Sequence, residues 1–193
     1  MVTWQEGADS FIEALADKSS VPGGGSAAAL SAAMGAALMM MAAGVTVKRK
    51  ATPQEDKDFL TPYLAKIEAY KNEFKHLTKE DAAAYLEVIT LKKQAPSAEQ
   101  EKALAKAQIR AAEVPAITAQ KAQELLKIVA EIEVKIAKII VSDLLCARVL
   151  LFTALECCGE NIKTNLPYVS DENLKNRLEL KYKEITALCK QRV

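Results

Sequence analysis

An uncharged segment runs from Val21 to Val47, and between Gly23 and Gly44 it consists of glycine, alanine and serine apart from a few leucines and methionines. Small side chains let helix backbones approach closely, so such a helix is typical of the interior of a helical bundle. A membrane-spanning helix is the alternative, since about 20 apolar residues cross a bilayer. However, this composition has weak transfer hydrophobicity, and the rest of the chain is densely charged. We therefore expect a buried helix at the centre of a soluble bundle or of an oligomer, and no membrane partner.

The composition favours an all-α fold. Half of the 193 residues are hydrophobic but only 5% are aromatic, and there are 7 glycines and 6 prolines, which favours helices over a β-sandwich or barrel. The length fits one helical domain spanning residues 1–193. Lysine and arginine number 26 against 25 acidic residues, so charge alone gives no reason to expect a nucleic-acid partner. We therefore expect the partners of this protein to be small molecules or second copies of the same chain.

The four cysteines and the single histidine follow no metal-binding spacing. A structural zinc site would need ligands that this inventory supplies poorly, so we expect no metal site. The thiols are typical of buried small hydrophobic residues in a reducing cytosol. The first ten residues carry two acids and no apolar core, unlike a signal peptide. These features predict a cytoplasmic protein.

Capping residues, prolines and glycines predict where the helices begin and end. Residues 131–136 alternate with period two, as a strand would, but no partner strand is evident, so we expect them to be helical. The first expected helix runs from a capping box at Thr3 and Glu6 to about Asp17, and the second is the uncharged segment. A third helix starts at an N-cap at Thr52, a fourth runs from Thr78 to about residue 95, and a fifth runs from Ser97 to a break at Pro115. The last three are a long helix from Ala116 to about Cys158 with Gly159 as its C-cap, a short helix at 161–166, and a helix from Ser170–Asp171 to about Cys189.

A glycine turn opens the uncharged helix and is the strongest candidate binding site. Glycines let backbone N–H groups point inward at close range, and the positive end of the helix dipole attracts an anion. The turn is not a Walker loop, because no strand precedes it and no Gly-Lys-Ser/Thr closes it. A tight linker between two packed helices is the alternative. The candidate residues are Pro22, Gly23, Gly24, Gly25 and Ser26.

Three cations, Lys48, Arg49 and Lys50, stand at the other end of the same helix. In the first interpretation, these cations stabilise the helix by lying at the negative end of its dipole. The second is a docking point for the carboxylates of an acidic ligand. Position alone favours the first interpretation.

Two aspartates are candidate acids. Asp143 follows Ser142 inside an apolar run, where it is either an N-cap or a buried acid whose raised proton affinity suits proton transfer. Asp81 is the second candidate, although an acid is also common in the first turn of a helix. Asn161 and Asn165 stand four residues apart, so they present two amides on one helix face or cap a helix.

Taken together, these motifs resemble the formiminotransferase-cyclodeaminase family. The first motif is the specific one, while the others are short and gain weight from their order and spacing. The resemblance covers almost the whole chain through Ser20–Leu30, Gly35–Met41, Thr46–Lys50, Asp81–Tyr85, Ala111–Pro115, Val141–Asp143 and Glu160–Leu166.

This resemblance implies an all-α fold, a homodimer with sites near the subunit interface, and a tetrahydrofolate derivative as substrate with no permanently bound cofactor. A cyclodeaminase closes 5-formiminotetrahydrofolate to the 5,10-methenyl compound and releases ammonia, and Asp143 and Asp81 are the candidate proton-transfer groups. The turn Pro22–Ser26, with Arg49 and Lys50, suits the glutamate carboxylates or the pterin. Ser142, Asn161 and Asn165 are further candidate substrate-binding residues.

The chain also departs from the family pattern. Lys48 stands where members often have glycine, and the apolar run 138–141 replaces a stretch that usually contains glycine. Leu144, Leu145 and Cys146 replace small residues. The family also includes methenyltetrahydrofolate cyclohydrolases, so a cyclohydrolase is one alternative to the cyclodeaminase. The departures add a second alternative, a non-catalytic dimeric helical protein that binds an anionic metabolite.

Overall fold

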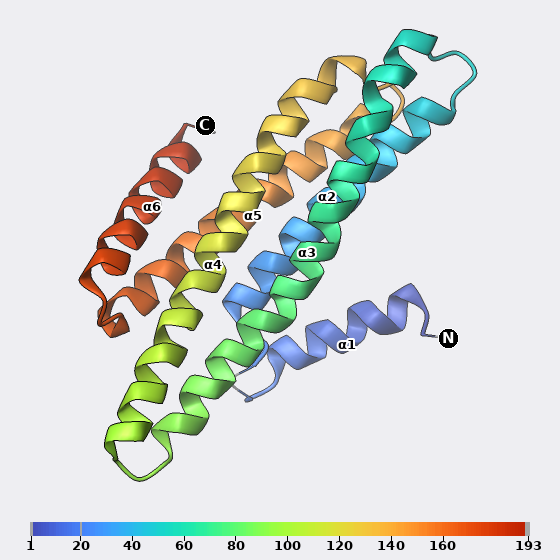
Figure 1. Cartoon of the computed structure of the whole chain (residues 1–193). Coiled ribbons are helices and arrows are strands. Elements are labelled where there is room, and N and C mark those ends of the chain that lie inside the picture. Colours follow the sequence, from blue (N-terminus) through green and yellow to red (C-terminus); the bar gives the residue numbers. More distant parts are fainter. Residues whose placement is uncertain (1, 20, 192–193) are drawn as a thin grey trace.

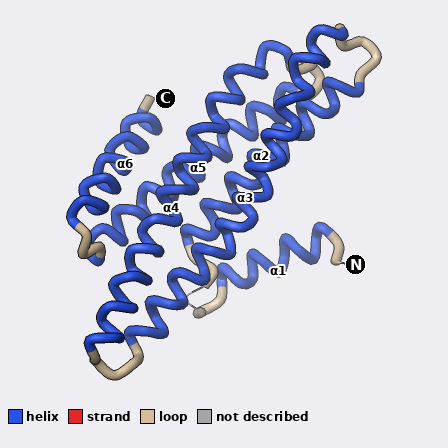
Figure 2. The backbone as a smooth tube through the Cα atoms, in the orientation of Figure 1, coloured by secondary structure: helices blue, strands red, loops and turns tan. Residues whose placement is uncertain are grey.

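The computed structural model describes residues 2–19 and 21–191, and in these ranges helices and loops account for the whole chain, without a strand (Figure 2). The predicted all-α fold is confirmed. Ser20, which belongs to the first family-like motif, lies outside the described residues, as do 1, 192 and 193. The elements are α1 (Trp4–Ala16), α2 (Gly24–Lys48), α3 (Gln54–Lys92), α4 (Ala98–Ile132), the 3₁₀ turn η1 (Glu133–Lys135), α5 (Val141–Asn165), the 3₁₀ turn η2 (Leu166–Tyr168) and α6 (Glu172–Lys190).

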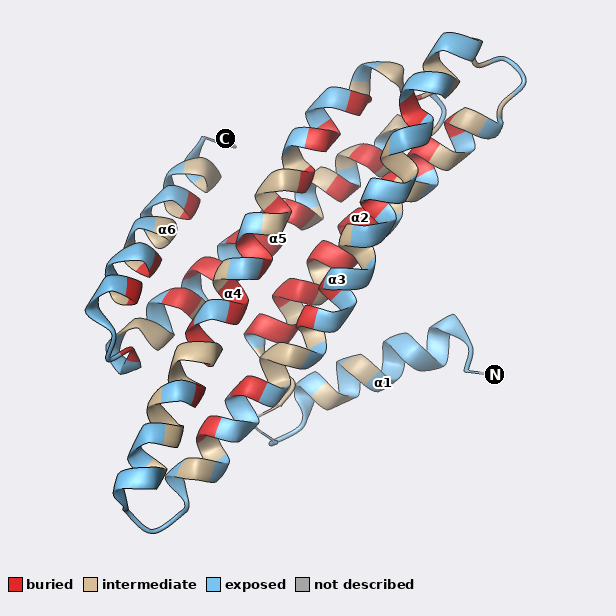
Figure 3. Cartoon of the chain, in the orientation of Figure 1, coloured by how far each residue is buried: buried red, intermediate tan, exposed pale blue. Residues whose placement is uncertain are grey.

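Helices α2 to α5 form a bundle in which consecutive helices run in opposite directions (Figure 1). Helix α2 packs against α3 and α5, and α4 packs against the same two helices from the opposite side. Helix α6 lies on the outside of α5 and α4. Helix α1 projects away from the bundle and buries none of its residues (Figure 3).

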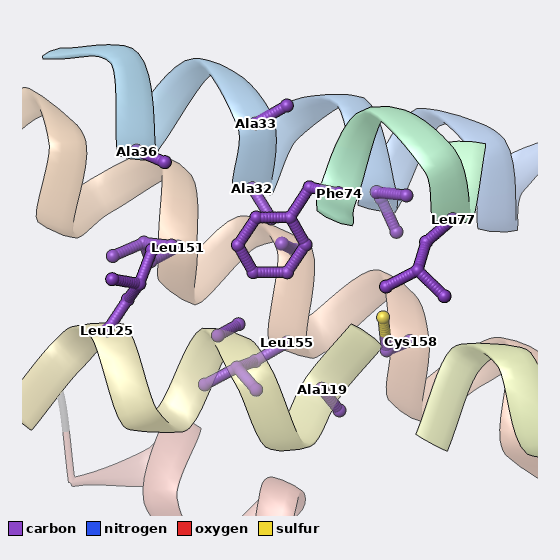
Figure 4. Packing of buried hydrophobic residues seen from close by; sticks show 14 of the residues in the cluster. Ala32, Ala33, Ala36, Phe74, Leu77, Ala119, Leu125, Leu151, Leu155 and Cys158 are labelled. Carbon is purple, nitrogen blue, oxygen red and sulfur yellow. The ribbon is translucent and has the colours of Figure 1, made fainter. Parts of the chain in front are cut away.

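The small residues of α2 allow the close packing predicted for them. A Cβ atom at Gly35 would lie 3.1 Å from the backbone oxygen of Ala147 on α5, which is closer than ordinary van der Waals contact. Larger side chains from the other helices fill the space beside these alanines: Phe74 of α3 lies next to Ala32, and Leu155 of α5 faces them from below (Figure 4). The core therefore joins a small-residue helix to large side chains from its neighbours.

Helix α2 differs from the prediction in one respect, because its outward stripe is exposed. Met34, Met41 and Val45 are 46%, 41% and 37% exposed, respectively. In the described residues α2 alone is long and apolar enough to cross a membrane, and half of its most apolar stretch is buried in the bundle. Its packing against α3 and α5 is that of a core helix with one open face.

Two predicted helix breaks are wrong. Helix α3 continues through Thr78, whose hydroxyl donates to the Phe74 carbonyl 2.9 Å away instead of capping a new helix. Helix α4 continues through Pro115, although proline has no N–H to donate to the Ala111 carbonyl. The side chain of Asn165 donates to that carbonyl at 3.0 Å. A partner from α5 thus compensates for the proline.

Other predicted boundaries also shift. Helix α3 begins after Pro53, because the hydroxyl of Thr52 donates to the Thr46 carbonyl rather than capping the helix. Helix α5 passes through Gly159, where a Cβ atom would lie 3.4 Å from Ile185 of α6, so this glycine serves helix packing rather than a C-cap. The predicted long helix is interrupted between Ile132 and Val141, with residues 133–135 in a 3₁₀ turn. The capping box of α1 and the Asp171 N-cap of α6 are confirmed.

Candidate active site

The carboxylate of Asp81 on α3 lies against the first turn of α2. Its Oδ2 accepts a hydrogen bond from the Ser26 hydroxyl at 2.8 Å. The backbone of α2 comes so close here that a Cβ atom at Gly25 would overlap the Asp81 carboxyl group. Glycine at this position therefore lets the acid reach the start of the helix.

Burial raises the pKa of Asp81 above its ordinary value, while hydrogen bonds from Ser26 act in the opposite direction. Cys158 lies close enough that the Asp81 charge contributes to raising the thiol pKa, although burial is the main cause. An acid with a raised pKa holds its proton more tightly than an exposed aspartate does. A group with a raised pKa is better suited both to accept and to return a proton than an exposed aspartate is.

A cavity of about 250 Å³ opens beside this carboxylate. Its walls come from the loop before α2 and the first turn of α2, from the C-terminal half of α3, from α4, and from the end of α5. This volume suits the reacting part of a small molecule. The lining residues are Val21, Gly23, Gly24, Gly25, Asp81, Tyr85, Ala111, Asn161, Thr164 and Asn165.

The two predicted asparagines both line the cavity, but they differ in their bonds. The amide of Asn165 donates to the Ala111 carbonyl and so ties α5 to α4. The amide of Asn161 donates to the Cys157 carbonyl of its own helix at 2.8 Å. A Cβ atom at Gly24 would lie 3.3 Å from the Asn161 nitrogen, so the Asn161 side chain faces the glycine turn.

Four predicted residues lie at the opposite end of the bundle. Arg49 and Lys50 follow the end of α2, and Ser142 and Asp143 stand in the first turn of α5. At 1.5 Å per residue, Ser26 and Arg49 are about 35 Å apart along α2. The structure therefore brings together the glycine turn, Asp81, Asn161 and Asn165, and leaves these four residues apart from them within one chain.

Sequence reasoning missed Tyr85 and Thr164 as cavity residues. Tyr85 follows Asp81 by four positions, and Thr164 follows Asn161 by three, so each lies on the same helix face as a predicted residue. Helical spacing from the predicted residues was the signal that could have identified both. Among the described residues, no group of three or more histidine, cysteine or acidic side chains is arranged to hold a metal ion.

Comparison with known proteins places this chain in a family. The family model described as formiminotransferase-cyclodeaminase matches residues 7–184. The chain belongs to the formiminotransferase-cyclodeaminase family. The expected resemblance is thereby confirmed, and the Asp81 cavity is a candidate site of a folate-related family member.

A crystal structure of formiminotetrahydrofolate cyclodeaminase from Thermotoga maritima has the same fold as this family member. The TM-score is 0.83 at 24% sequence identity, and the match covers 98% of this chain and 91% of the other. At that identity the likeness concerns the fold. No curated protein compared with the chain gave a match.

Proposed function

We propose that this protein is a formiminotetrahydrofolate cyclodeaminase, which converts 5-formiminotetrahydrofolate to 5,10-methenyltetrahydrofolate and ammonia in the Asp81 cavity. The observation that carries the proposal is the buried carboxyl group of Asp81, held by Ser26 beside a cavity, in a chain of this family. The fold shared with the Thermotoga enzyme is consistent with it.

The reaction needs one proton to move between two nitrogens. N10 of the folate bonds to the carbon of the protonated formimino group on N5, and the N10 proton is released. That proton ends on the exocyclic nitrogen, which leaves as ammonia when its bond to carbon breaks. The product retains the positive charge as the methenyl bridge. A single carboxyl group that first accepts the proton and then returns it completes the sequence.

Asp81 fits this role by its environment. Its raised pKa brings its proton affinity closer to that of the reacting nitrogens than an exposed aspartate would offer. As a carboxylate, it also stabilises the positive charge of the methenyl bridge. Ser26 fixes the orientation of the carboxyl group, and the first-turn N–H groups of α2 offer donors to acceptor atoms of the folate.

The proposed mechanism uses side chains and the substrate's own nitrogen nucleophile, so it calls for no bound cofactor. The tetrahydrofolate derivative is the substrate.

Asp143, the other acid predicted from sequence, follows Ile140 at the start of α5, whereas Asn161 is near the end of that helix. Asn161 follows Asp143 by 18 positions, which corresponds to about 27 Å along the helix. The catalytic role of Asp143 stays a prediction, and mutation can separate it from the role of Asp81.

An absorbance assay for 5,10-methenyltetrahydrofolate tests the proposal. The purified protein should generate the methenyl absorbance from 5-formiminotetrahydrofolate, with ammonia released in equal amount. Loss of added methenyltetrahydrofolate without formation from the formimino compound would instead identify a cyclohydrolase. Absence of both activities would identify a non-catalytic family member.

We expect the active form to be a homodimer. The outward stripe of α2 is apolar and exposed in a single chain, and so are Trp4 and Ile12 of α1. A second copy that covered such faces would remove apolar surface from water. Sedimentation of the Met34→Glu variant should show monomers where the wild type shows dimers, whereas Leu180→Glu on α6 should leave the dimer intact. A wild type that sediments as a monomer at all concentrations would contradict the expectation.

A cytoplasmic location is also proposed. All four cysteines lie in the described part of the chain, and none of them is in a disulfide bond. Cys146 is exposed, which suits a reducing compartment. Fractionation of cells that express the protein should recover it with soluble cytoplasmic markers, and recovery with the membranes would contradict this location.

A further inference from the structure

The Asp81 cavity adjoins two further hollows. On one side it shares Gly24 and Asn161 with a hollow of about 660 Å³ between α5 and α6. On the other side it shares Tyr85 and Thr164 with a cavity of about 160 Å³ that extends toward the end of α3. We call these three adjoining hollows the groove: an elongated ligand that passes the Asn161 side chain, which faces Gly24 where two of the hollows meet, would contact all three.

Helix geometry gives this groove its direction. Asp81, Tyr85 and Lys92 are spaced by four and seven positions, so they lie along one face of α3. The eleven residues from Asp81 to Lys92 correspond to about 16 Å along the helix axis. Lys92 lines the outermost compartment. The groove therefore offers a cation at a fixed distance from the candidate catalytic acid.

The two ends of the groove differ in charge. The hollow between α5 and α6 is lined by the carboxylates of Glu156 and Glu160, by the ring of Tyr182 and by one cation, Lys190. The residues that line the compartment at Lys92 include no carboxylate.

At that end, the Lys92 ammonium group lies 4.9 Å from the centre of the Tyr168 ring, and the amide of Gln108 lines the wall. The α5–α6 end therefore suits hydrogen-bond donors on a flat ring, and the α3 end suits carboxylates and an aromatic ring.

The two ends of a folate differ in the same way as the groups that the two ends of the groove suit. Its pterin carries an amino group and a ring N–H, which are donors, and its other end carries glutamate carboxylates beyond a benzoyl ring. We infer that the substrate lies along this groove with its pterin between α5 and α6, its reacting nitrogens at Asp81 and its glutamate tail at Lys92. This inference rests on the proposed function, since it orients the substrate in that same site.

The inference assigns the tail to a different cation from those predicted by sequence. Arg49 and Lys50 lie about 35 Å from Ser26 along α2. A folate with one glutamate that reacts at Asp81 does not extend that far within one chain. Lys92 lies at the end of the groove that suits carboxylates. Its sequence neighbour Lys93 does not line the groove, so Lys93 provides a matched control.

Calorimetric titration with 5-formyltetrahydrofolate, a stable N5-substituted folate, tests the inference without requiring turnover. Lys92→Gln should weaken binding about 1.4-fold to fivefold, the usual range for an exposed ion pair, and Lys93→Gln should bind like the wild type. The same titration with the 5-formyltetrahydropteroate analogue, which lacks glutamate, should show no difference between Lys92→Gln and the wild type.

Two outcomes would overturn the inference, and they are distinguishable. If the wild type binds the folate but Lys92→Gln binds equally well, or if Lys50→Gln weakens binding in its place, the tail is not at Lys92 and the proposed function stands. If the wild type binds neither compound, the proposed function fails, and the orientation fails with it.

Discussion

Asp81 and Ser26 are 55 positions apart in the sequence, and the Ser26 hydroxyl donates to the Asp81 carboxylate at 2.8 Å. This bond joins the middle of α3 to the first turn of α2. It favours the ionised acid, whereas burial favours the neutral one. The balance between these two effects determines the pH at which Asp81 can accept a proton.

Replacing Ser26 with alanine should shift that balance. Without the hydroxyl, the pKa of Asp81 rises further, since the side-chain hydrogen bond from Ser26 that lowers it is gone. The acidic limb of the kcat/KM profile should therefore move to higher pH, with a lower rate at neutral pH. An unchanged acidic limb in Ser26→Ala would show that another group determines it. Ser31→Ala, which changes a half-buried serine of α2 outside the site, is the control.

Gly25→Ala should disrupt the site because the added methyl group would overlap the Asp81 carboxyl group. We expect a loss of at least about tenfold in kcat/KM and a destabilisation of about 1–3 kcal/mol, as for other overpacked sites. Gly44→Ala is the matched control on the same helix, since a methyl group there meets no atom within 4 Å. It should stabilise the protein by about 0.5–1 kcal/mol. Thermal unfolding and the methenyl assay measure both effects, and equal behaviour of the two variants would contradict the close contact.

Replacing the two cavity asparagines one at a time should affect different properties, protein stability for Asn165 and substrate binding for Asn161. Asn165→Ala leaves the Ala111 carbonyl, which Pro115 cannot satisfy, without its partner from α5. This should cost about 1–3 kcal/mol in the free energy of unfolding. Asn161→Ala loses a bond within its own helix and should cost less stability, but it should raise KM. Urea unfolding and steady-state kinetics distinguish them, and the reverse pattern would contradict these roles.

The sequence predicted the all-α class and the buried small-residue helix because both depend on local composition. It missed the continuity of α3 and α4, since Thr78 was expected to start a new helix and Pro115 to break one. The fate of Pro115 depends on Asn165, a contact from another helix that local pattern does not reveal.

The candidate site at Asp81 was predicted only in part for the same reason. The glycine turn was visible as a motif, and Asp81 was one of two candidate acids. Their contact follows from how α3 packs against α2, over a long separation in sequence. Arg49 and Asp143 had the right chemistry for a folate site, but helix lengths place them at the opposite end of the bundle.

Asp81→Asn should be more stable than the wild type at neutral pH. The folded-state pKa of Asp81 is raised, so the folded protein binds this proton more tightly than the unfolded chain does. Wild-type stability therefore falls as the pH rises from the ordinary aspartate pKa through the raised one, and stays reduced above it. Asparagine removes this cost and can still accept the Ser26 bond. The melting temperature should rise at pH 7, with a smaller gain near pH 4. A lower melting temperature at pH 7 would contradict the burial of a charged group.

The most direct test of the proposed active site compares Asp81→Asn with Asp143→Asn in the methenyl assay. Asparagine at 81 keeps the size and the hydrogen bond but cannot carry the proton, so turnover should fall by about 100-fold or more while the fold is retained. Asp143→Asn should stay within a few fold of the wild type if the Asp81 cavity is the reaction site. Full activity of Asp81→Asn, with loss of activity in Asp143→Asn, would contradict the account.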